Sequence, residues 1–239
     1  MRRAPHTWVP DPRSPEPTAA ERAAGVRRGP ERHSVRDQVL GALRGEIVSG
    51  ALVPGSVHSA PALAARFGVS ATPVREAMQS LAREGAVEVL PNRGFRIGER
   101  TARDLAELAE VRALLEVPVV LALARTVSVG QWEELRPLAA ATMAAAALGD
   151  RSAYAESDRA FHRALLSLSG NLQLVSVADE LHRRAQWPLS VPQPHRPTRP
   201  AALLADATQH SVLLEALIAS DLETVESLAR EHFSGSAWA

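Results

Sequence analysis

Four side chains in the second half of the sequence are of types that bind metal ions, and they fall where a protein core is expected. Asp158 and His162 are four residues apart, so on a helix both would point to the same side. His210 and His232 each stand among apolar residues spaced as on the buried face of a helix. A single buried histidine is usually a hydrogen-bonded core residue, but burying three beside a carboxylate is costly unless one partner satisfies them all. A divalent cation would do so, and these residues therefore predict a metal site.

The composition limits which chemistry is open to such a site. The 239 residues include no cysteine, so disulfides and thiolate metal sites are excluded and any metal must use His and carboxylates. No apolar run approaches the roughly 20 residues that cross a membrane, and no signal-peptide core follows the N-terminus. We therefore expect a cytoplasmic protein with no membrane partner.

The formal net charge of +0 conceals an uneven distribution along the chain. Residues 1–100 hold 15 Arg against 10 acidic residues (+5), and residues 101–239 hold 12 Arg against 17 acidic residues (−5). All of these cationic side chains are Arg, which suits bidentate contacts to phosphate or guanine. The first 100 residues are thus the better candidate for binding a nucleic acid.

The elements that would position the four candidate ligands are helices. Apolar periodicity predicts helices at 102–126, 131–148, 151–168, 171–186, 201–219 and 221–234, which would form an antiparallel six-helix bundle spanning residues 101–239. Thr101 and Asp104 are spaced as a capping box at its start. The Pro-rich segment 188–200 cannot be a continuous helix, and it could be either a cover over the bundle's cavity or a solvated connection.

A different pattern precedes the bundle. It predicts helices at 34–49, 61–67 and 71–84, followed by a hairpin of Val87–Leu90 and Phe95–Ile97. Two short helices joined by a turn holding Gly68 are typical of a helix-turn-helix, and the hairpin would be its wing. Residues 34–100 therefore predict a DNA-binding domain. Residues 1–33, rich in Pro, Arg and Ala, predict a flexible tail that is either a basic arm on DNA or merely solvated.

Both halves resemble one known family. Leu63–Ser70, Thr72–Met78, Glu84-Gly85 and Asn92–Phe95 resemble the winged helix of GntR-family transcription regulators. Asp158–His162, Ser169–Asn171, His210 and Glu231–Phe233 resemble the FCD ligand-binding domain of the FadR subfamily within that family. The two resemblances together cover all of the chain except the tail.

The FCD resemblance implies that Asp158, His162, His210 and His232 are metal ligands, with one or two octahedral positions left for water or a carboxylate of a ligand. The ligand set suits Zn²⁺, Ni²⁺ or Mn²⁺ without choosing between them.

Three more residues bear on the metal site without being expected to bind the metal. Arg112 is similar to a cavity-facing arginine of the family, which could clamp a second carboxylate or pair with Glu116. Tyr154, one turn before Asp158, is expected to line the effector site. His182 is expected at the surface or behind the ligands rather than on the metal.

The winged-helix resemblance implies DNA contacts by Thr72 and Arg75 on the recognition helix and by Arg93 and Gly94 at the wing tip. Ala71 departs from the family pattern, which usually has an Arg there. A methyl group cannot read guanine, so we expect a different operator, weaker affinity or more reliance on the wing and the N-terminal arm.

These features predict a homodimeric, ligand-responsive transcription regulator, most simply a repressor. It would bind a pseudo-palindromic operator in double-stranded DNA, and a small organic acid at the metal would change the orientation of the two DNA readers. Three alternatives stay open: a metal-dependent enzyme, a metal sensor whose cation is the effector, and a dimerisation module whose His are core residues. We expect no enzymatic activity, because no further Glu or His is placed as a general base.

Overall fold

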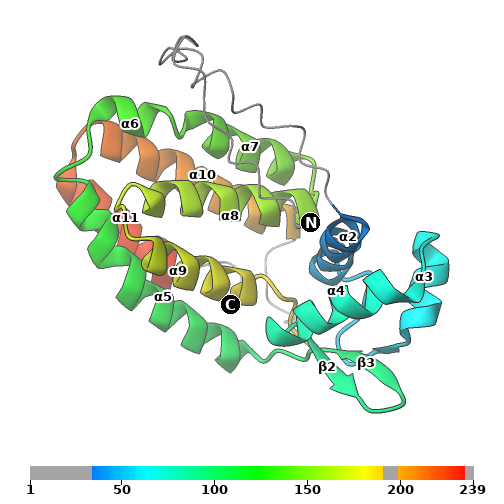
Figure 1. Ribbon diagram of the computed structural model, residues 1–239. Coiled ribbons are helices and arrows are strands. Elements are labelled where there is room, and N and C mark those ends of the chain that lie inside the picture. Colours follow the sequence, from blue (N-terminus) through cyan, green and yellow to red (C-terminus); the bar gives the residue numbers. More distant parts are fainter. Residues whose placement is uncertain (1–33, 191–198, 235–239) are drawn as a thin grey trace, which may run out of the picture. The chain divides into compact units, whose positions relative to one another are not determined.

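A computed structural model describes residues 34–190 and 199–234 of the chain. The predicted tail at 1–33 and most of the Pro-rich segment, with His195, lie outside the described residues. The remainder belongs to one compact unit, Ser34–Ala239, in which helices predominate (Figure 1). In the described residues, no helix combines the length and the apolar character that crossing a membrane requires.

The predicted winged helix is confirmed. It consists of α2 (Val35–Ser49), α3 (Ala60–Phe67), α4 (Ala71–Arg83) and a sheet of β1 (Val57–His58), β2 (Val87–Leu90) and β3 (Gly94–Ile97). The side chain of Ser34 accepts a hydrogen bond from the Asp37 amide at the start of α2, and a left-handed Gly50 ends that helix, as expected for helix caps. The apolar faces meet in a core that includes Leu43, Ile47, Leu63, Met78 and Leu81.

The sheet has one more strand than the hairpin that the sequence predicted. Its antiparallel order is β1-β3-β2, with Val57 paired to Arg96 and His58 to Phe95. Gly94 begins β3 at a φ of 109°, and a Cβ there would lie 2.4 Å from the His58 carbonyl oxygen. Pairing of β1 therefore requires glycine at this position independently of any contact with DNA.

The C-terminal part is all helical. It contains α5 (Ala102–Leu123), α6 (Val129–Glu133), α7 (Arg136–Ala147), α8 (Arg151–Ser167), α9 (Leu172–Ala185), α10 (Arg199–Ile218) and α11 (Leu222–Ser234). The prediction of one helix over 131–148 is wrong, because α6 and α7 divide it. Pro137, in the first turn of α7, has no amide hydrogen to continue a helix from α6, and this explains the break.

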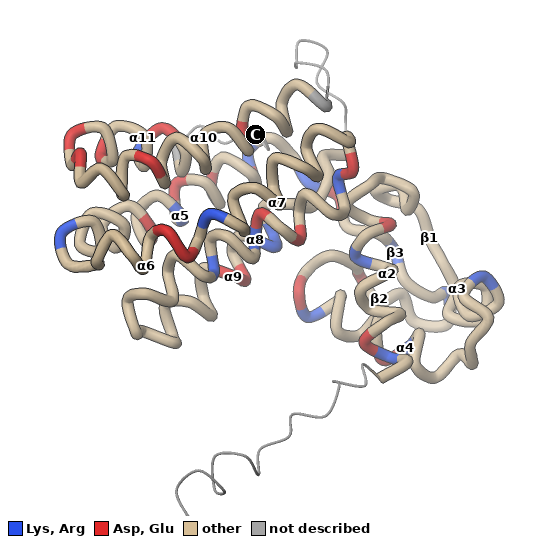
Figure 2. The backbone as a smooth tube through the Cα atoms, turned by 90° about the horizontal axis from the view of Figure 1, so that it is seen from above, with Lys and Arg blue, Asp and Glu red and all other residues tan. Residues whose placement is uncertain are grey.

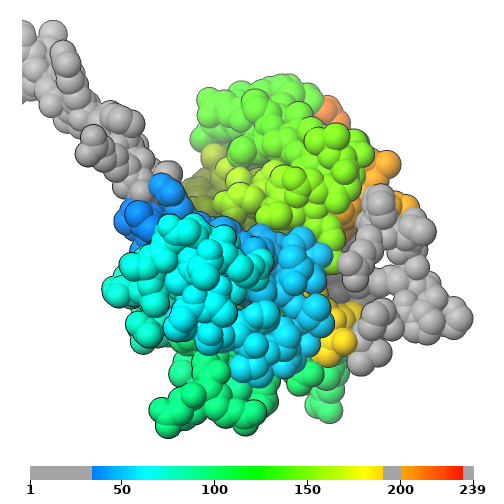
Figure 3. Space-filling view, turned by 90° about the vertical axis from the view of Figure 1, so that its right-hand side faces the viewer, coloured from blue at the N-terminus to red at the C-terminus, as the bar shows by residue number. Residues whose placement is uncertain are grey.

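The long helix α8 contacts elements from both ends of the chain. It packs against α7, α9 and α10 of the bundle and also against α2 of the winged helix. A Cβ on Gly45 of α2 would lie 2.6 Å from the Ser152 hydroxyl oxygen of α8, so the Ser152 side chain packs directly against this glycine. Ala155 of α8 and Trp187, just after α9, also belong to the winged-helix core. The space-filling view shows the blue and cyan residues of the winged helix in continuous contact with green residues of the bundle (Figure 3).

Candidate metal centre

The four predicted metal ligands come together inside the bundle. Asp158 and His162 project from α8, His210 from α10 and His232 from α11, and none is more than 6% exposed. The Nε2 atom of His162 lies 3.1 Å from the Nε2 atoms of both His210 and His232. Oδ1 of Asp158 lies 3.2 Å from Nε2 of His210 and 3.5 Å from Nε2 of His162. One carboxylate oxygen and three imidazole nitrogens thus converge.

These separations fit a bound divalent cation. Ligand atoms about 2.1 Å from a metal lie about 3.0 Å apart at octahedral angles and about 3.4 Å apart at tetrahedral angles. The cavity beside them has a volume of about 10 Å³, which is the room that one water molecule or ion needs. Its lining residues are Arg112, Tyr154, Asp158, His162, His182, Asp206 and His232. The arrangement can therefore hold a cation, but it has no space for an organic acid beside it.

The hydrogen bonds on the outer nitrogens decide which inner nitrogens can bind a metal. Nδ1 of His232 lies 3.0 Å from the Gln209 Oε1 acceptor, so it carries the proton and leaves a lone pair on Nε2. Nδ1 of His162 lies 3.9 Å from Oε2 of Glu116, and neither buried atom has a hydrogen-bond partner. A shift of about 1 Å would join this pair and orient His162 in the way that outer carboxylates orient metal-binding histidines.

A fourth imidazole, His182 of α9, belongs to the cluster, but it carries its proton on the nitrogen that faces the cluster. It is 3% exposed, with Nε2 2.5 Å from Oδ2 of Asp158 and Nδ1 2.9 Å from Nη2 of Arg112. A guanidinium can only donate, so Nδ1 must accept and Nε2 must carry the proton that it donates to Asp158. His182 consequently has no free lone pair for a metal. The expectation of a surface position was wrong, and its alternative, a place behind the ligands, describes the observed contacts.

Arg112 pairs with Glu116, one of the two alternatives that the sequence left open. Its Nε lies 2.8 Å from Oε1 of Glu116, and both side chains are almost fully buried. Its guanidinium also lies 5.5 Å from the centre of the Phe233 ring, as in cation–π contacts. Tyr154 lines the same small cavity, together with Asp206, which sequence reasoning missed, and its expected role in effector binding stays a prediction.

Burial sets the charges of this cluster. It lowers the pKa of His182 to about 4 and that of His210 to about 3, and it holds the pKa of His232 well below its usual range. Burial opposes ionisation of Asp158, but His182 and His162 beside it keep its pKa well below the usual value. At neutral pH His210 and His232 are therefore neutral and Asp158 is ionised, which are the forms that bind a cation.

The predicted DNA contacts lie on the winged helix. Thr72 and Arg75 are exposed on α4, Arg93 is exposed at the hairpin turn and Gly94 is half-buried. Among the described residues, the guanidinium of neither Arg75 nor Arg93 makes a hydrogen bond or ion pair within the protein, so both side chains can contact a phosphate or base. Ala71 packs on the winged-helix core, which gives this departure from the family pattern a structural role.

Acidic and basic positions are interspersed along both the winged helix and the helical bundle (Figure 2). Residues 34–100 carry 8 Arg and 6 acidic residues, an excess of +2, and the other +3 of the basic half falls in residues 1–33.

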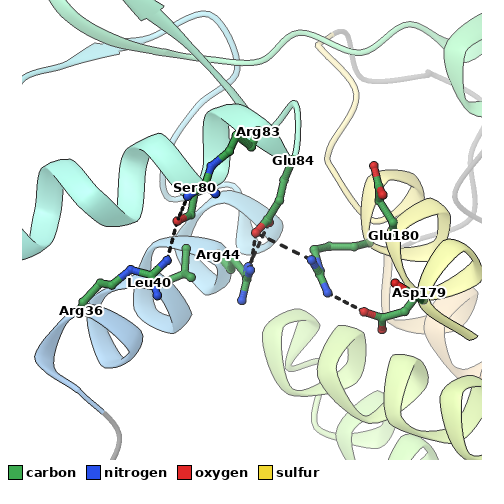
Figure 4. A pocket seen from close by; sticks show the side chains of 10 residues that line it. Arg36, Leu40, Arg44, Ser80, Arg83, Glu84, Asp179 and Glu180 are labelled. Carbon is green, nitrogen blue, oxygen red and sulfur yellow. Dashed lines mark hydrogen bonds and ion pairs between the residues drawn. The ribbon is translucent and has the colours of Figure 1, made fainter. Parts of the chain in front are cut away.

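A second hollow lies where α9 meets the winged helix. Its volume is about 430 Å³, and its lining includes Arg44, Glu84 and Asp179 (Figure 4). Glu84 caps the C-terminal end of α4, accepts a hydrogen bond from Arg44 Nε at 3.1 Å and lies 3.7 Å from Nη1 of Arg183. Arg183 directly follows His182 on α9. Helix α9 therefore contacts Asp158 of the candidate metal centre through His182 and the end of the recognition helix through Arg183.

Both the winged helix and the helical bundle match known protein families. Residues 35–97 match the family described as bacterial regulatory proteins, gntR family, and residues 107–235 match the FCD domain. The "probable D-xylose utilization operon transcriptional repressor" of Paenarthrobacter nicotinovorans is 30% identical over 201 residues, which cover 84% of this chain and 86% of that protein. The transcriptional regulator McbR of Escherichia coli is 30% identical over 189 residues, 78% of this chain and 83% of that one.

Solved structures agree with these matches. The E. coli McbR structure aligns with a TM-score of 0.67 at 28% identity, over 84% of this chain and 93% of that one. A GntR regulator from Rhodococcus sp. RHA1 shares the fold, with a TM-score of 0.61 at 22% identity over 84% and 95% of the two chains.

We predict that the metal-free protein loses stability in mild acid. His182 and His210 have folded-state pKa values of about 4 and about 3, below the 6.5 of an ordinary histidine. Between pH 6.5 and 4 the unfolded chain therefore binds more protons, and stability falls as the pH falls. Two such groups should remove about 2 kcal/mol of the free energy of unfolding between pH 7 and 5.5, measured by urea unfolding with a chelator present.

His210→Leu provides the control, because it should reduce this acid loss by about 1 kcal/mol. Equal stability of the unsubstituted protein at the two pH values would contradict the prediction.

Proposed function

Because the chain belongs to the GntR family of bacterial regulatory proteins and carries an FCD domain, it is a DNA-binding transcription regulator, and we propose that a divalent cation in its helical bundle controls it. The convergence of Asp158, His162, His210 and His232 carries this proposal. The ligand set suits Zn²⁺, Ni²⁺ or Mn²⁺. When bound, the cation would neutralise the buried carboxylate and link three helices. An FCD domain with this ligand set fits the FadR subfamily.

We infer repression as the mode of regulation, because the similar protein of P. nicotinovorans is named a repressor. A regulator that binds a pseudo-palindromic operator with two-fold symmetry acts as a homodimer. On α5, Val111, Leu114 and Pro118 are exposed at i, i+3 and i+7, and Leu114 is 73% exposed. This apolar stripe is the surface that we propose for dimer contact.

A small organic acid is the second candidate effector, as the sequence resemblance implied. It would need the Arg112 guanidinium, which is bonded to Glu116 and His182, and more room than the cavity of about 10 Å³ provides. The small volume of the cavity favours the cation itself as the signal. Either ligand would act on DNA binding through α8 and α9, which contact both the cluster and the winged helix.

The test of cation control measures metal binding and operator affinity on the same preparation. We expect chelator-treated protein to bind one of the three metals with micromolar affinity or better, and His210→Ala to bind it at least 100-fold more weakly. Operator affinity should change about 5- to 150-fold on metal addition, the usual range of allosteric coupling. His58→Ala, in β1, is the control and should bind metal normally. An unchanged operator affinity would exclude control by the cation.

Arg75 should contribute directly to DNA affinity. We expect Arg75→Ala to weaken binding about 5- to 150-fold, the cost of losing one good base or phosphate contact, when anisotropy is measured on a fragment that the wild-type chain selects from random DNA. Arg103→Ala is the control, because Arg103 is also exposed but lies on α5, paired with Glu107. A similar loss in both variants would show that only the general charge matters.

The proposed dimer surface predicts a change of assembly in Leu114→Glu. A carboxylate in the centre of an apolar contact would be desolvated without a partner, so we expect the dimer dissociation constant to rise at least tenfold by sedimentation equilibrium. Leu148→Glu is the matched control, because Leu148 is 84% exposed at the end of α7. If the Leu114→Glu chain remains as dimeric as the control, the dimer contact lies elsewhere.

A further inference from the structure

Arg112, His182 and Asp158 form a buried chain of hydrogen bonds that does more than position a ligand. We propose that His182 closes the metal centre to small carboxylates, so that this chain responds to the cation alone. The inference rests on the proposed metal site and concerns a residue outside its ligand set.

The guanidinium of Arg112 is the group at this site that would attract a carboxylate, and two of its nitrogens already donate hydrogen bonds within the protein. Nε donates to Glu116 at 2.8 Å, Nη2 donates to His182 at 2.9 Å, and the Phe233 ring lies against it. A carboxylate prefers to take two parallel N–H groups of an arginine. A carboxylate that took the Nε and Nη2 donors of this arginine would therefore have to displace Glu116 or His182.

His182 also satisfies Asp158, which a carboxylate cannot do. The imidazole accepts from Arg112 with Nδ1 and donates to Oδ2 of Asp158 with Nε2. An anion in its place would accept from Arg112 but would set a second negative charge beside Asp158 with no proton between them. The neutral imidazole therefore links a cation and an anion without adding charge.

The same contact directs Asp158 toward the cluster. Oδ2 accepts from His182 and, at 3.0 Å, from Nε2 of Gln186, which leaves Oδ1 facing His162 and His210. Asp158 is thus set to offer one oxygen to a cation. The adjoining cavity of about 10 Å³ accepts a water or an ion, whereas acetate, with four heavy atoms, needs more room than a single water.

Removing the imidazole of His182 should free the Arg112 donor and enlarge the space beside the ligands. His182→Ala deletes five ring atoms between Arg112 and Asp158, frees the Nη2 donor and opens space next to the ligands. The variant should therefore gain acetate binding at its bound metal. His182→Gln retains an acceptor for Arg112 and a donor for Asp158 on one amide, and it should stay closed. Gln186→Ala removes the other hydrogen bond to Oδ2 and leaves the Arg112–His182 contact, so it is the matched control.

The experiment uses Co²⁺ as the metal probe and acetate as the carboxylate probe on the full chain. The visible absorption of bound Co²⁺ reports a change of its ligands directly. We expect 10 mM acetate to leave the spectra of the wild type, His182→Gln and Gln186→Ala unchanged. The same acetate should change the spectrum of His182→Ala. The apparent affinity of that variant for acetate should be at least tenfold higher than that of the wild type. Adding Arg112→Gln to His182→Ala should abolish the gain.

The outcomes separate this inference from the proposed function. A wild-type Co²⁺ spectrum that shifts with acetate as readily as that of His182→Ala would overturn the inference and leave the metal site standing. The same holds if Gln186→Ala opens the site equally. If the wild type develops no Co²⁺ spectrum at all, the metal site itself fails, and this inference fails with it. Should His182→Ala not fold, the wild-type response to acetate still decides.

Discussion

A buried negative charge is the constraint on which the bundle depends. Asp158 is ionised in the interior, and the nearby Arg112 is already paired with Glu116, so these three groups leave one uncompensated negative charge beside the neutral imidazole of His210. A charge without a partner is expensive to bury, and hydrogen bonds from His182 and Gln186 reduce that cost without removing it. A divalent cation at the convergence point would more than offset it. Binding of such a cation would therefore be coupled to folding of the bundle.

Much of this arrangement follows from the sequence, and the reasons differ from residue to residue. Helical periodicity identified the inward faces of α8, α10 and α11, and three inward faces with ligating residues are enough to predict convergence. His182 was harder, because Asp179, Arg183 and Arg184 around it are typical of an exposed helix. Its burial is imposed by α5 and α8, which pack on α9 from distant positions in the chain. The two-residue β1 was too short to give any pattern.

The hydrogen-bond partner of Arg112 could not be predicted from the sequence for a related reason. Arg112 had two chemically reasonable partners, and only the packing of α5 against α9, which sets His182 at its Nη2 atom, selects one of them. The size of the cavity likewise depends on how five helices close around it. The residues at the site could be identified from spacing, but whether an organic acid fits beside the metal depends on tertiary structure.

The route from the cation to DNA follows from two close contacts. The cation would hold α8 through Asp158 and His162, while α8 meets α2 where Gly45 leaves no space for a Cβ beside Ser152. On the other side, α9 joins Asp158 through His182 and the end of α4 through Arg183 and Glu84. Tightly packed contacts transmit small displacements because they have little room to absorb them. A change of about 1 Å at the cluster, such as the closure of His162 on Glu116, therefore has two direct paths to the winged helix, one to α2 and one to the end of α4, the helix that presents Thr72 and Arg75.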